Sequence, residues 1–582
     1  MSYYGSRTPI VGNIIMKNKL IAEIFRQIAE ILEIKGENLF RIRAYERAAQ
    51  NIESLPDDIE LFVKDDKLRD IPGIGKDLEE KIKEIVATGR LKYLEELKKD
   101  IPEGLLEILK VPGIGPKTAK LLYEKLDIQD VVMLERMAHA GKIRSLPGMG
   151  EKTEENILHG IELVKKGRDR MDLKTAMDVA TSFVSQIKTL KDVKKIDPAG
   201  SLRRMKETIR DIDILVSSKD PEKIMNRFTS LAEVKDILAK GPTKSSVLTK
   251  DNIQVDVRVV DDVSYGAALM YFTGSKEHNI KLRQIAVKKK LKLNEYGLFR
   301  GKKRIAGKTE AEMYKLLGLE YIEPELREDR GEVEAAINKT LPDIIELRDI
   351  KGDLHIHSTW SDGGSSIEDI VIKARKIGYE YIAITDHSQG LKIAGGLDKH
   401  ELGLKRKEIE RLNNKYKDIK ILFGTEVDID SNGNLDYPDE VLKEMDIVIA
   451  AIHAGFKQPK EVLTKRIIKA CQNRYVHIIA HLTGRLWGAR DSYEVNLEEI
   501  FKVCKDTDIV LEINSFPQRL DLNDVVSRMA RDAGVKLVIN TDAHLSEQLD
   551  MMKFGCAVAR RAWLEKKDII NTKSLSKLGL KR

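Results

Sequence analysis

The sequence predicts a multidomain chain: a helical N-terminal region, a mixed α+β central region and a C-terminal α/β barrel. Three observations support this fold class. A pentapeptide containing Pro-Gly occurs three times between residues 71 and 150, each time before a helix-like pattern. Two β-like runs with aspartates lie at 209–216 and 253–259, and from residue 351 short apolar strands alternate with amphipathic helices. A chain of 582 residues is also too long for a single hydrophobic core.

Composition narrows the class of protein. Hydrophobic residues make up 42% of the chain, as in ordinary globular proteins, and no apolar run has the length of a transmembrane helix. The three cysteines, Cys471, Cys504 and Cys556, lie far apart in the sequence, which argues against a disulfide framework. The formal net charge of +7 permits nucleic-acid binding. We therefore expect a monomeric cytoplasmic protein that does not associate with membranes.

The N-terminal region is predicted to be helical. Apolar residues recur at helical spacing over 18–32 and again over 40–55. An apolar-Pro-Gly-apolar-Gly pentapeptide then occurs at 71–75, 111–115 and 146–150. A single copy is usually only a tight turn, but three copies indicate helix-hairpin-helix modules, whose backbone N–H groups bind DNA phosphates without reading bases. The expected DNA-binding positions are Gly73, Gly75, Gly113, Gly115, Gly148 and Gly150.

Three aspartates in the central region predict a metal site. Strand alternation over 209–216 places the carboxylates of Asp211 and Asp213 on one face. The run 253–259 has the same period and supplies Asp256 if the two strands pair. Clustered oxygen donors suit Mg²⁺ or Mn²⁺, and two such ions are a known arrangement for nucleotidyl transfer. Aspartate pairs at strand ends are usually not catalytic, but the Gly-Ser-Leu-Arg-Arg loop at 200–204 favours catalysis here.

Residues 263–325 are expected to form a further α+β unit. It contains Tyr-Phe-Thr-Gly-Ser at 271–275, and eleven basic residues lie between 281 and 308 against one acid, Glu295. A charge run is usually a solvated face, but its position here favours a track for a nucleic-acid backbone. Residues 321–350 are acidic and contain prolines, which is typical of an interdomain connector.

The C-terminal region is predicted to be a parallel βα barrel, with strands near 381–384, 419–423, 447–451, 477–480, 509–513 and 535–539. In such barrels the chemistry lies where strands end. Nine potential metal ligands occupy these positions: His355, His357, Asp362, His387, Glu426, His453, His481, Asp542 and His544. Mixed imidazole and carboxylate donors indicate about three Zn²⁺, Mn²⁺ or Fe ions. Such a cluster is suited to phosphoester hydrolysis.

Both halves resemble known families. Residues 16–325 resemble a family X DNA polymerase, the class that includes polymerase beta, through the Pro-Gly hairpins, Gly-Ser-Leu-Arg-Arg, Asp-Ile-Asp, Val-Asp-Val and Tyr-Phe-Thr-Gly-Ser in that order. Residues 351–582 resemble a PHP (polymerase and histidinol phosphatase) domain, and the whole chain is similar to bacterial and archaeal family X polymerases that end in this domain. The resemblance implies six segments: a lyase-like helix-hairpin-helix domain at 1–90, a second helix-hairpin-helix domain at 91–168, a nucleotidyltransferase palm at 169–262, a nucleotide-selecting thumb at 263–325, a linker at 326–350 and a distorted TIM-like PHP barrel at 351–582.

The resemblance also implies roles for single residues. Asp211, Asp213 and Asp256 would hold the two catalytic metals, and Gly200, Ser201 and Arg204 would bind the phosphates of the incoming nucleotide. The sugar and base of that nucleotide would contact Tyr271, Phe272, Gly274, Asn279 and Arg283. Two positions depart from polymerase beta, because Lys276 replaces an acid and Gln254 replaces an arginine.

A lyase activity is a further implication of the resemblance. Lys81 would attack the sugar aldehyde at an incised abasic site and form a Schiff base. Arg41, Tyr45 and Arg47 would contact the 5′-phosphate. Asp77 replaces a basic residue of the animal enzyme, and a lysine at this point of a helix is usually a solvated surface residue. Both interpretations of Lys81 stay open.

The favoured interpretation is a gap-filling polymerase of base excision repair whose partners are gapped or nicked DNA and deoxynucleoside triphosphates. Its PHP domain would be a metal-dependent 3′–5′ exonuclease or phosphoesterase that also processes abasic sites. An alternative is a DNA-binding PHP phosphoesterase with an inactive polymerase half, which the complete aspartate trio disfavours. A non-catalytic scaffold predicts missing ligands, and a histidinol phosphatase predicts no DNA-binding half, so neither fits the sequence.

Overall fold

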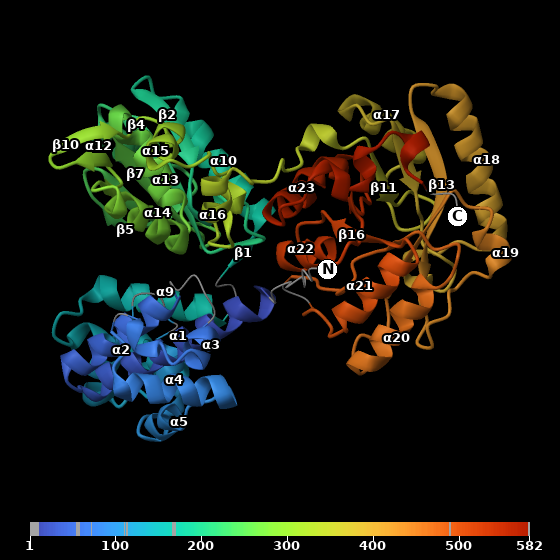
Figure 1. Ribbon diagram of the computed structural model, residues 1–582. Coiled ribbons are helices and arrows are strands. Elements are labelled where there is room, and N and C mark those ends of the chain that lie inside the picture. Colours follow the sequence, from blue (N-terminus) through green and yellow to red (C-terminus); the bar gives the residue numbers. More distant parts are fainter. Residues whose placement is uncertain are drawn as a thin grey trace, which may run out of the picture. The chain divides into compact units, whose positions relative to one another are not determined.

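The computed structural model describes residues 11–53, 59–71, 73–109, 111, 114–165, 170–487 and 490–579 (Figure 1). The chain divides into two compact units, Met1–Asp169 and Arg170–Arg582. Among the described residues, no helix has both the length and the apolar character needed to cross a bilayer. The three cysteines are buried and form no disulfide among the described residues.

The described part of the first unit is helical, as the sequence predicted. Its helices are α1 (Val11–Lys35), α2 (Leu39–Glu53), α3 (Ile59–Lys64), α4 (Lys76–Thr88), α5 (Lys92–Lys99), α6 (Glu103–Ile108), α7 (Pro116–Leu126), α8 (Val131–His139) and α9 (Glu151–Lys165). The apolar stripes of α1 and α2 meet in a common core that includes Ile28, Leu32 and Ile52. Helices α4, α7 and α9 each begin directly after a repeated pentapeptide, which confirms the helix-hairpin-helix pattern.

The second unit begins with a five-stranded sheet. Its strand order is β2 (Val193–Pro198), β4 (Asp211–Ser218), β7 (Gln254–Val260), β6 (Lys244–Thr249) and β5 (Val234–Lys240). Strands β4 and β7 are parallel, and the other neighbours are antiparallel. Helices α10 (Leu173–Lys188) and α12 (Pro221–Thr229) share one core with Ile212 and Ile214 of β4. Because side chains alternate along a strand, Asp211 and Asp213 lie on the opposite face.

A smaller α+β unit follows the sheet. It consists of α13 (Tyr265–Thr273), α14 (Lys276–Lys288), the antiparallel strands β8 (Lys292–Asn294), β9 (Gly297–Arg300) and β10 (Lys303–Ala306), and α15 (Glu310–Leu317). Residues 326–350, expected to be a linker, instead contain helix α16 (Glu332–Asn338) and pack against this unit. Apolar packing of Val333 and Ala336 holds the segment there together with two polar contacts: Arg327 Nη1 lies 2.6 Å from Glu310 Oε1, and Glu332 Oε1 lies 2.7 Å from His278 Nδ1.

The C-terminal region is a nearly closed parallel barrel, as predicted. Seven strands pair in chain order: β11 (Gly352–Ile356), β12 (Tyr381–Ile384), β13 (Lys420–Asp428), β14 (Ile447–Ala451), β15 (Ile478–Ile479), β16 (Val510–Asn514) and β17 (Leu537–Asn540). A bridge between Ile356 and Ala543 and a 2.8 Å hydrogen bond from His357 N to Ala543 O join the first and last strands. The helices lie outside the strands, among them α18 (Lys399–Lys415), α20 (Lys460–Cys471) and α21 (Leu497–Asp506) (Figure 1).

Candidate active sites

The three central aspartates come together on the parallel strands β4 and β7. Their register places Asp213 directly opposite Asp256 and Asp211 opposite Gln254. Burial, followed by the charges of Asp211 and Asp256, raises the pKa of Asp213 to about 7. The carboxylates are therefore close enough to repel one another, and a divalent cation bound between them would relieve this repulsion. The arrangement fits the predicted Mg²⁺ or Mn²⁺ ligands.

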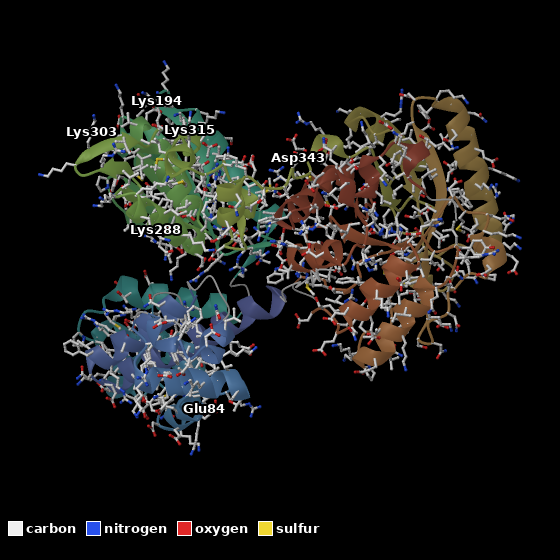
Figure 2. The ribbon with its side chains drawn as sticks, in the orientation of Figure 1. Glu84, Lys194, Lys288, Lys303, Lys315 and Asp343 are labelled. Atoms are coloured by element: carbon white, nitrogen blue, oxygen red, sulfur yellow. The ribbon has the colours of Figure 1, made fainter. Side chains whose placement is uncertain are left out.

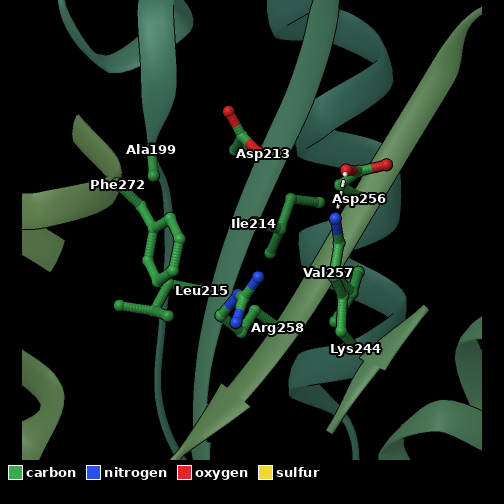
Figure 3. Close-up of a pocket in the computed structure, with 9 residues that line it drawn as sticks. All are labelled: Ala199, Asp213, Ile214, Leu215, Lys244, Asp256, Val257, Arg258 and Phe272. Atoms are coloured by element: carbon green, nitrogen blue, oxygen red, sulfur yellow. Dashed lines mark ion pairs between the residues drawn. The ribbon is translucent and has the colours of Figure 1, made fainter. Parts of the chain in front are cut away.

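Two cations that the sequence analysis did not single out also line this pocket (Figure 3). Lys244 Nζ lies 3.4 Å from Asp256 Oδ2, and the Arg258 guanidinium lies 4.4 Å from the centre of the Phe272 ring. Lys244 is on β6 and Arg258 on β7. Strand alternation places Arg258 on the same face of β7 as Asp256, whereas Lys244 comes beside Asp256 only because β6 pairs with β7.

The Gly-Ser-Leu-Arg-Arg loop lies against Asp213. It forms the short helix α11 (Gly200–Arg203), which begins at Gly200 with a φ of +61°. A Cβ atom on Gly200 would lie 2.4 Å from Asp213 Oδ2, so glycine is required both by this contact and by the left-handed backbone. Ser201 is the next residue of α11 and is half-buried. The loop predicted to hold phosphates is thus adjacent to the predicted metal ligands.

Arg204, the expected phosphate ligand, already has partners. Its Nε donates to Glu328 Oε1 at 2.9 Å, and its Nη1 donates to the carbonyl of Thr273. A Cβ on Gly274 would lie 3.1 Å from Arg204 Nη1, so this arginine borders the Tyr-Phe-Thr-Gly-Ser run. A nucleotide phosphate that binds Arg204 has to compete with the carboxylate of Glu328.

The other predicted nucleotide contacts fall into two groups. Phe272 lines the pocket that contains Asp213 and Asp256. Tyr271, Asn279 and Arg283 line a separate small pocket, where Asn279 Nδ2 donates to Tyr271 O at 2.7 Å. The structure therefore joins Asn279 and Arg283 to Tyr271 but not to the aspartates.

The basic stretch from 281 to 308 is mostly solvent-exposed. Lys288 and Lys303 are exposed at the periphery of their unit (Figure 2). Lys281 differs, because its Nζ lies 2.6 Å from Asp329 Oδ1 and 2.8 Å from Glu334 Oε1. The ammonium of Lys281 is thus neutralised by the 326–350 segment and does not contribute to a free positive track.

The nine predicted ligands of the barrel converge at the carboxyl ends of its strands. Eight of them form three overlapping groups of donor atoms: His355, His357 and Asp542; His357, Asp362, His387 and His544; and His387, Glu426 and His453. The ninth, His481, has its Nε2 2.9 Å from Glu426 Oε1. The structure therefore brings all nine predicted residues into one cluster.

The spacing of the donor atoms fits metal coordination. Ligands about 2.1 Å from a tetrahedral ion lie about 3.4 Å from one another. His355 Nε2 lies 3.2 Å from His357 Nε2 and 3.3 Å from Glu426 Oε2. His357 Nε2 lies 3.2 Å from Asp542 Oδ1. Imidazole nitrogens beside carboxylate oxygens are the donor types expected for Zn²⁺, Mn²⁺ or Fe.

The buried histidine nitrogens and the lowered pKa values of the carboxylates also fit metal binding by this cluster. The Nδ1 atoms of His357 and His481 are buried and make no hydrogen bond within the described residues, and His387 Nδ1 lies 3.0 Å from Glu426 Oε2. Burial by itself would raise the pKa of Glu426, but the neighbouring histidines His453 and His355 hold it well below its usual range. The pKa of Asp542 is held low in the same way by His355. The carboxylates thus stay ionised, as metal ligands must.

Two acids that contact the predicted ligands were not identified from the sequence. Glu512 Oε1 lies 2.7 Å from His355 Nδ1, and Asp428 Oδ1 lies 3.2 Å from His453 Nδ1. A carboxylate on one ring nitrogen turns the other toward a metal. Glu512 is fully buried within the strand sequence Val-Leu-Glu-Ile-Asn, and a lone acid in such an apolar run is the signal that marks it.

In the first unit, Lys81 lies in an aromatic environment together with Arg41 and Tyr45. Its Nζ is hydrogen-bonded to Asp77 and lies 5.0 Å from the centre of the Tyr93 ring. Tyr93 accepts a 2.7 Å hydrogen bond from Arg41 Nη2 and stacks on Tyr45, with the ring centres 6.4 Å apart. The Lys81 side chain is only 14% exposed. Tyr93, which joins these residues, was not identified from the sequence.

The hairpin glycines present uncovered backbone. Gly75 and Gly115 are the N-cap residues of α4 and α7, and neither helix has a side-chain cap within the described residues. A Cβ atom would meet no described atom within 4 Å at Gly75, Gly115, Gly148 or Gly150. At Gly73 it would lie 3.3 Å from Arg47 Cδ, so Arg47 lies over the first hairpin. Gly113 lies outside the described residues.

Several known families and relatives match this chain. Four families match: a helix-hairpin-helix domain at 16–91, a SAM-like helix-hairpin-helix tandem at 105–162, the DNA polymerase beta thumb at 268–328 and the PHP domain at 353–516. The DNA polymerase/3′-5′ exonuclease PolX of Bacillus subtilis (strain 168) is 41% identical over 564 residues, which cover 96% of this chain and 98% of the relative. A probable phosphatase of Thermoanaerobacter sp. (strain X514) is 31% identical over 231 residues, 38% of this chain and 89% of that protein. DNA polymerase lambda of Arabidopsis thaliana is 29% identical over 347 residues, 53% of this chain and 62% of that protein. The chain belongs to the family X DNA polymerases that carry a C-terminal PHP domain.

Proposed function

We propose that this chain is a DNA polymerase and 3′–5′ exonuclease that fills short gaps during base excision repair. The single observation that supports two activities is the presence of two distinct donor clusters in one unit. Asp213 and Asp256 face each other on adjacent strands of the palm, and nine further donors meet at the barrel mouth. An inactive polymerase half, the alternative, does not explain why all three palm aspartates converge.

In the palm, Asp211, Asp213 and Asp256 would hold Mg²⁺ or Mn²⁺. When bound, these ions activate the primer 3′-hydroxyl and neutralise the leaving pyrophosphate. The protein supplies the position of the substrate. The missing side chain at Gly200 lets a triphosphate approach the carboxylates, and Arg204 offers a planar guanidinium suited to phosphate oxygens. Phe272, beside the same pocket, would limit space at the sugar.

In the barrel, the nine donors would hold about three Zn²⁺, Mn²⁺ or Fe ions. Such ions, when bound, lower the pKa of water and stabilise charge on a phosphoester. The residues of the chain set the orientation of the ligands, because Glu512 and Asp428 accept the Nδ1 protons of His355 and His453. The same chemistry would remove blocked 3′ ends and process abasic sites.

Gap filling is tested with a full-length chain on a one-nucleotide gap that carries either a 5′-phosphate or a 5′-hydroxyl. The helix N-termini at Gly75 and Gly115 favour phosphate binding, so we expect faster insertion with the 5′-phosphate and on a gap than on an open template. Equal rates on all three substrates would contradict a gap-filling role. No insertion under either Mg²⁺ or Mn²⁺ would support the alternative of an inactive polymerase half.

Lyase activity is proposed for Lys81. The amine would attack the sugar aldehyde, losing water as the Schiff base forms, and Asp77 is positioned to accept a proton from it. We expect borohydride to trap a covalent adduct with an incised abasic duplex, and Lys81→Ala to lower the trapped yield by at least about tenfold. Lys83→Ala is the matched control, because Lys83 lies on the same helix and pairs with Glu79. Unchanged trapping in Lys81→Ala would leave Lys81 as a structural residue.

A further inference from the structure

The side chain of Arg519 lies beside the metal-donor cluster of the barrel. Its Nε is 3.5 Å from Asp542 Oδ2, an oxygen that also accepts a 3.0 Å hydrogen bond from Asn514 Nδ2. The other oxygen of this carboxylate, Asp542 Oδ1, is 3.2 Å from His357 Nε2 and belongs to the donor cluster. The Arg519 guanidinium therefore lies against one of the predicted metal ligands, Asp542.

Part of this guanidinium has no partner. Arg519 Nη1 is buried and makes no hydrogen bond to any described residue. A guanidinium carries five N–H donors, and a buried donor without an acceptor is unfavourable. A phosphate group supplies oxygen acceptors in the geometry that arginine binds best. The unsatisfied donor and its position both point to a phosphate ligand.

The backbone of the loop that carries Arg519 is fixed by hydrogen bonds to other residues of the barrel region. Arg519 N and Leu520 N both donate to Phe516 O, at 2.7 and 3.0 Å. Arg485 donates from Nε to Arg519 O at 3.1 Å and from Nη2 to Leu520 O at 2.9 Å. Arg485 therefore fixes the backbone from which the Arg519 side chain extends.

Arg485 is itself anchored by the palm. Its Nη1 and Nη2 lie 3.0 and 2.9 Å from the two carboxylate oxygens of Glu207, a bidentate pair. Glu207 lies in the segment between the Gly-Ser-Leu-Arg-Arg loop and Asp211. A second barrel arginine, Arg561, contacts the end of that loop by donating to Arg204 O at 2.7 Å. The palm and the loop that carries Arg519 are thus joined by hydrogen bonds through Arg485.

We propose that Arg519 binds the scissile phosphate in the barrel and that Glu207 of the palm, acting through Arg485, is a positioning residue for it. This inference rests on the proposed exonuclease function. In hydrolysis the oxygen of water forms a bond to phosphorus, the bond from phosphorus to the 3′-oxygen breaks, and that oxygen receives a proton. Negative charge grows on the non-bridging oxygens during this step, and Arg519 donates to them.

The first test compares Arg519→Ala and Arg519→Lys in the full chain. Exonuclease kcat should fall about 100-fold in Arg519→Ala, by analogy with the loss of one oxyanion donor, and less in Arg519→Lys. Inorganic phosphate should inhibit the Arg519→Ala variant about tenfold more weakly. Bound metal per chain and primer extension should not change, which excludes misfolding. Arg474→Ala, at the other end of the barrel strands, is the matched control and should behave like the parent.

The second test concerns the contact with the palm. Glu207→Gln should lower exonuclease kcat about tenfold and weaken phosphate inhibition, and it should add nothing in the Arg519→Ala background. Glu222→Gln, an exposed palm substitution, is the control. The inference is overturned if Arg519→Ala digests DNA within twofold of the parent, if its metal is lost together with its activity, or if the two substitutions act independently. If His355→Ala also leaves digestion intact, the proposed exonuclease site itself is wrong.

Discussion

The palm and the barrel both gather acidic side chains, but they differ in how complete the resulting site is. The palm places three carboxylates on one face of two adjacent strands. The barrel collects nine donors from the ends of its strands, and the carboxylates of Glu512 and Asp428 contact two of their imidazoles. Mg²⁺ commonly binds through one or two carboxylates plus substrate phosphates, whereas Zn²⁺ sites are largely supplied by protein. The palm thus offers fewer protein donors than the barrel, so cations bound there would take more of their ligands from substrate and water.

The pKa shifts of the carboxylates also differ between the palm and the barrel. In the palm, burial and like charges raise the pKa of Asp213 to about 7. In the barrel, neighbouring histidines hold the pKa values of Glu426 and Asp542 well below their usual range, against the effect of burial. The palm carboxylates therefore need an added cation for balance, whereas the neighbouring imidazoles favour the ionised form of the barrel carboxylates.

The largest expected effect is a loss of primer extension, and it tests whether the palm and barrel sites act independently. Asp256→Ala should lower primer extension by about 10³-fold, because it removes a carboxylate directly opposite Asp213, while 3′ digestion should stay within about twofold of the parent. Steady-state extension and digestion of the same labelled primer measure both rates. Asp236→Ala, at an exposed position of β5, is the control. Loss of both activities in a folded Asp256→Ala variant would show that the sites are not independent.

The reverse experiment removes a predicted barrel ligand, and its expected effect on 3′ digestion is smaller. His355→Ala should lower 3′ digestion by about 10²-fold or more and reduce the metal bound per chain, since His355 contributes to the donor cluster and is held by Glu512. Primer extension should be retained. Elemental analysis of the purified protein, together with digestion assays under Mn²⁺ and Zn²⁺, provides the measurement. Full metal content in this variant would contradict the assignment of His355 as a ligand.

The smallest expected effect is on the local stability of the region around the Gly-Ser-Leu-Arg-Arg loop. Glu310 pairs with Arg203 of the loop and with Arg327 of the 326–350 segment. Burial alone would raise the pKa of Glu310, but Arg327 and Arg203 outweigh it and lower this pKa to about 2. A lowered folded-state pKa stabilises the fold above the ordinary value near 4.5, and this stabilisation is lost as the pH falls toward 2. The upper limit of this stabilisation is about 3 kcal/mol.

Glu310→Gln should therefore lower the local unfolding free energy at pH 7 and have little effect at the acid end of this range. Hydrogen exchange of α15 amides reports this local opening, which a global melting curve of a multidomain chain does not resolve. Glu320→Gln, at an exposed position, is the matched control. A difference between parent and Glu310→Gln that does not narrow below pH 4.5 would contradict the ion-pair explanation.

Much of the candidate chemistry could be predicted from local patterns. Strand alternation correctly placed Asp211 and Asp213 on one face, and the rule that barrel function lies at strand ends identified all nine clustered donors. What could not be predicted are partners far apart in the chain. Lys244 beside Asp256, Tyr93 beneath Lys81 and Glu328 on Arg204 follow no spacing rule.

The sequence by itself determined which residues share a face or a strand end, because the backbone repeats of helices and strands fix these relations within a few residues. Only the tertiary structure decided which charges are already paired. The 326–350 segment looked like a linker, yet its Glu328 binds both Arg204 and Arg561. Glu207 and Arg485, 278 positions apart, form a bidentate pair. Such pairs depend on how folded elements pack, and packing is set by the whole chain rather than by any one segment of it.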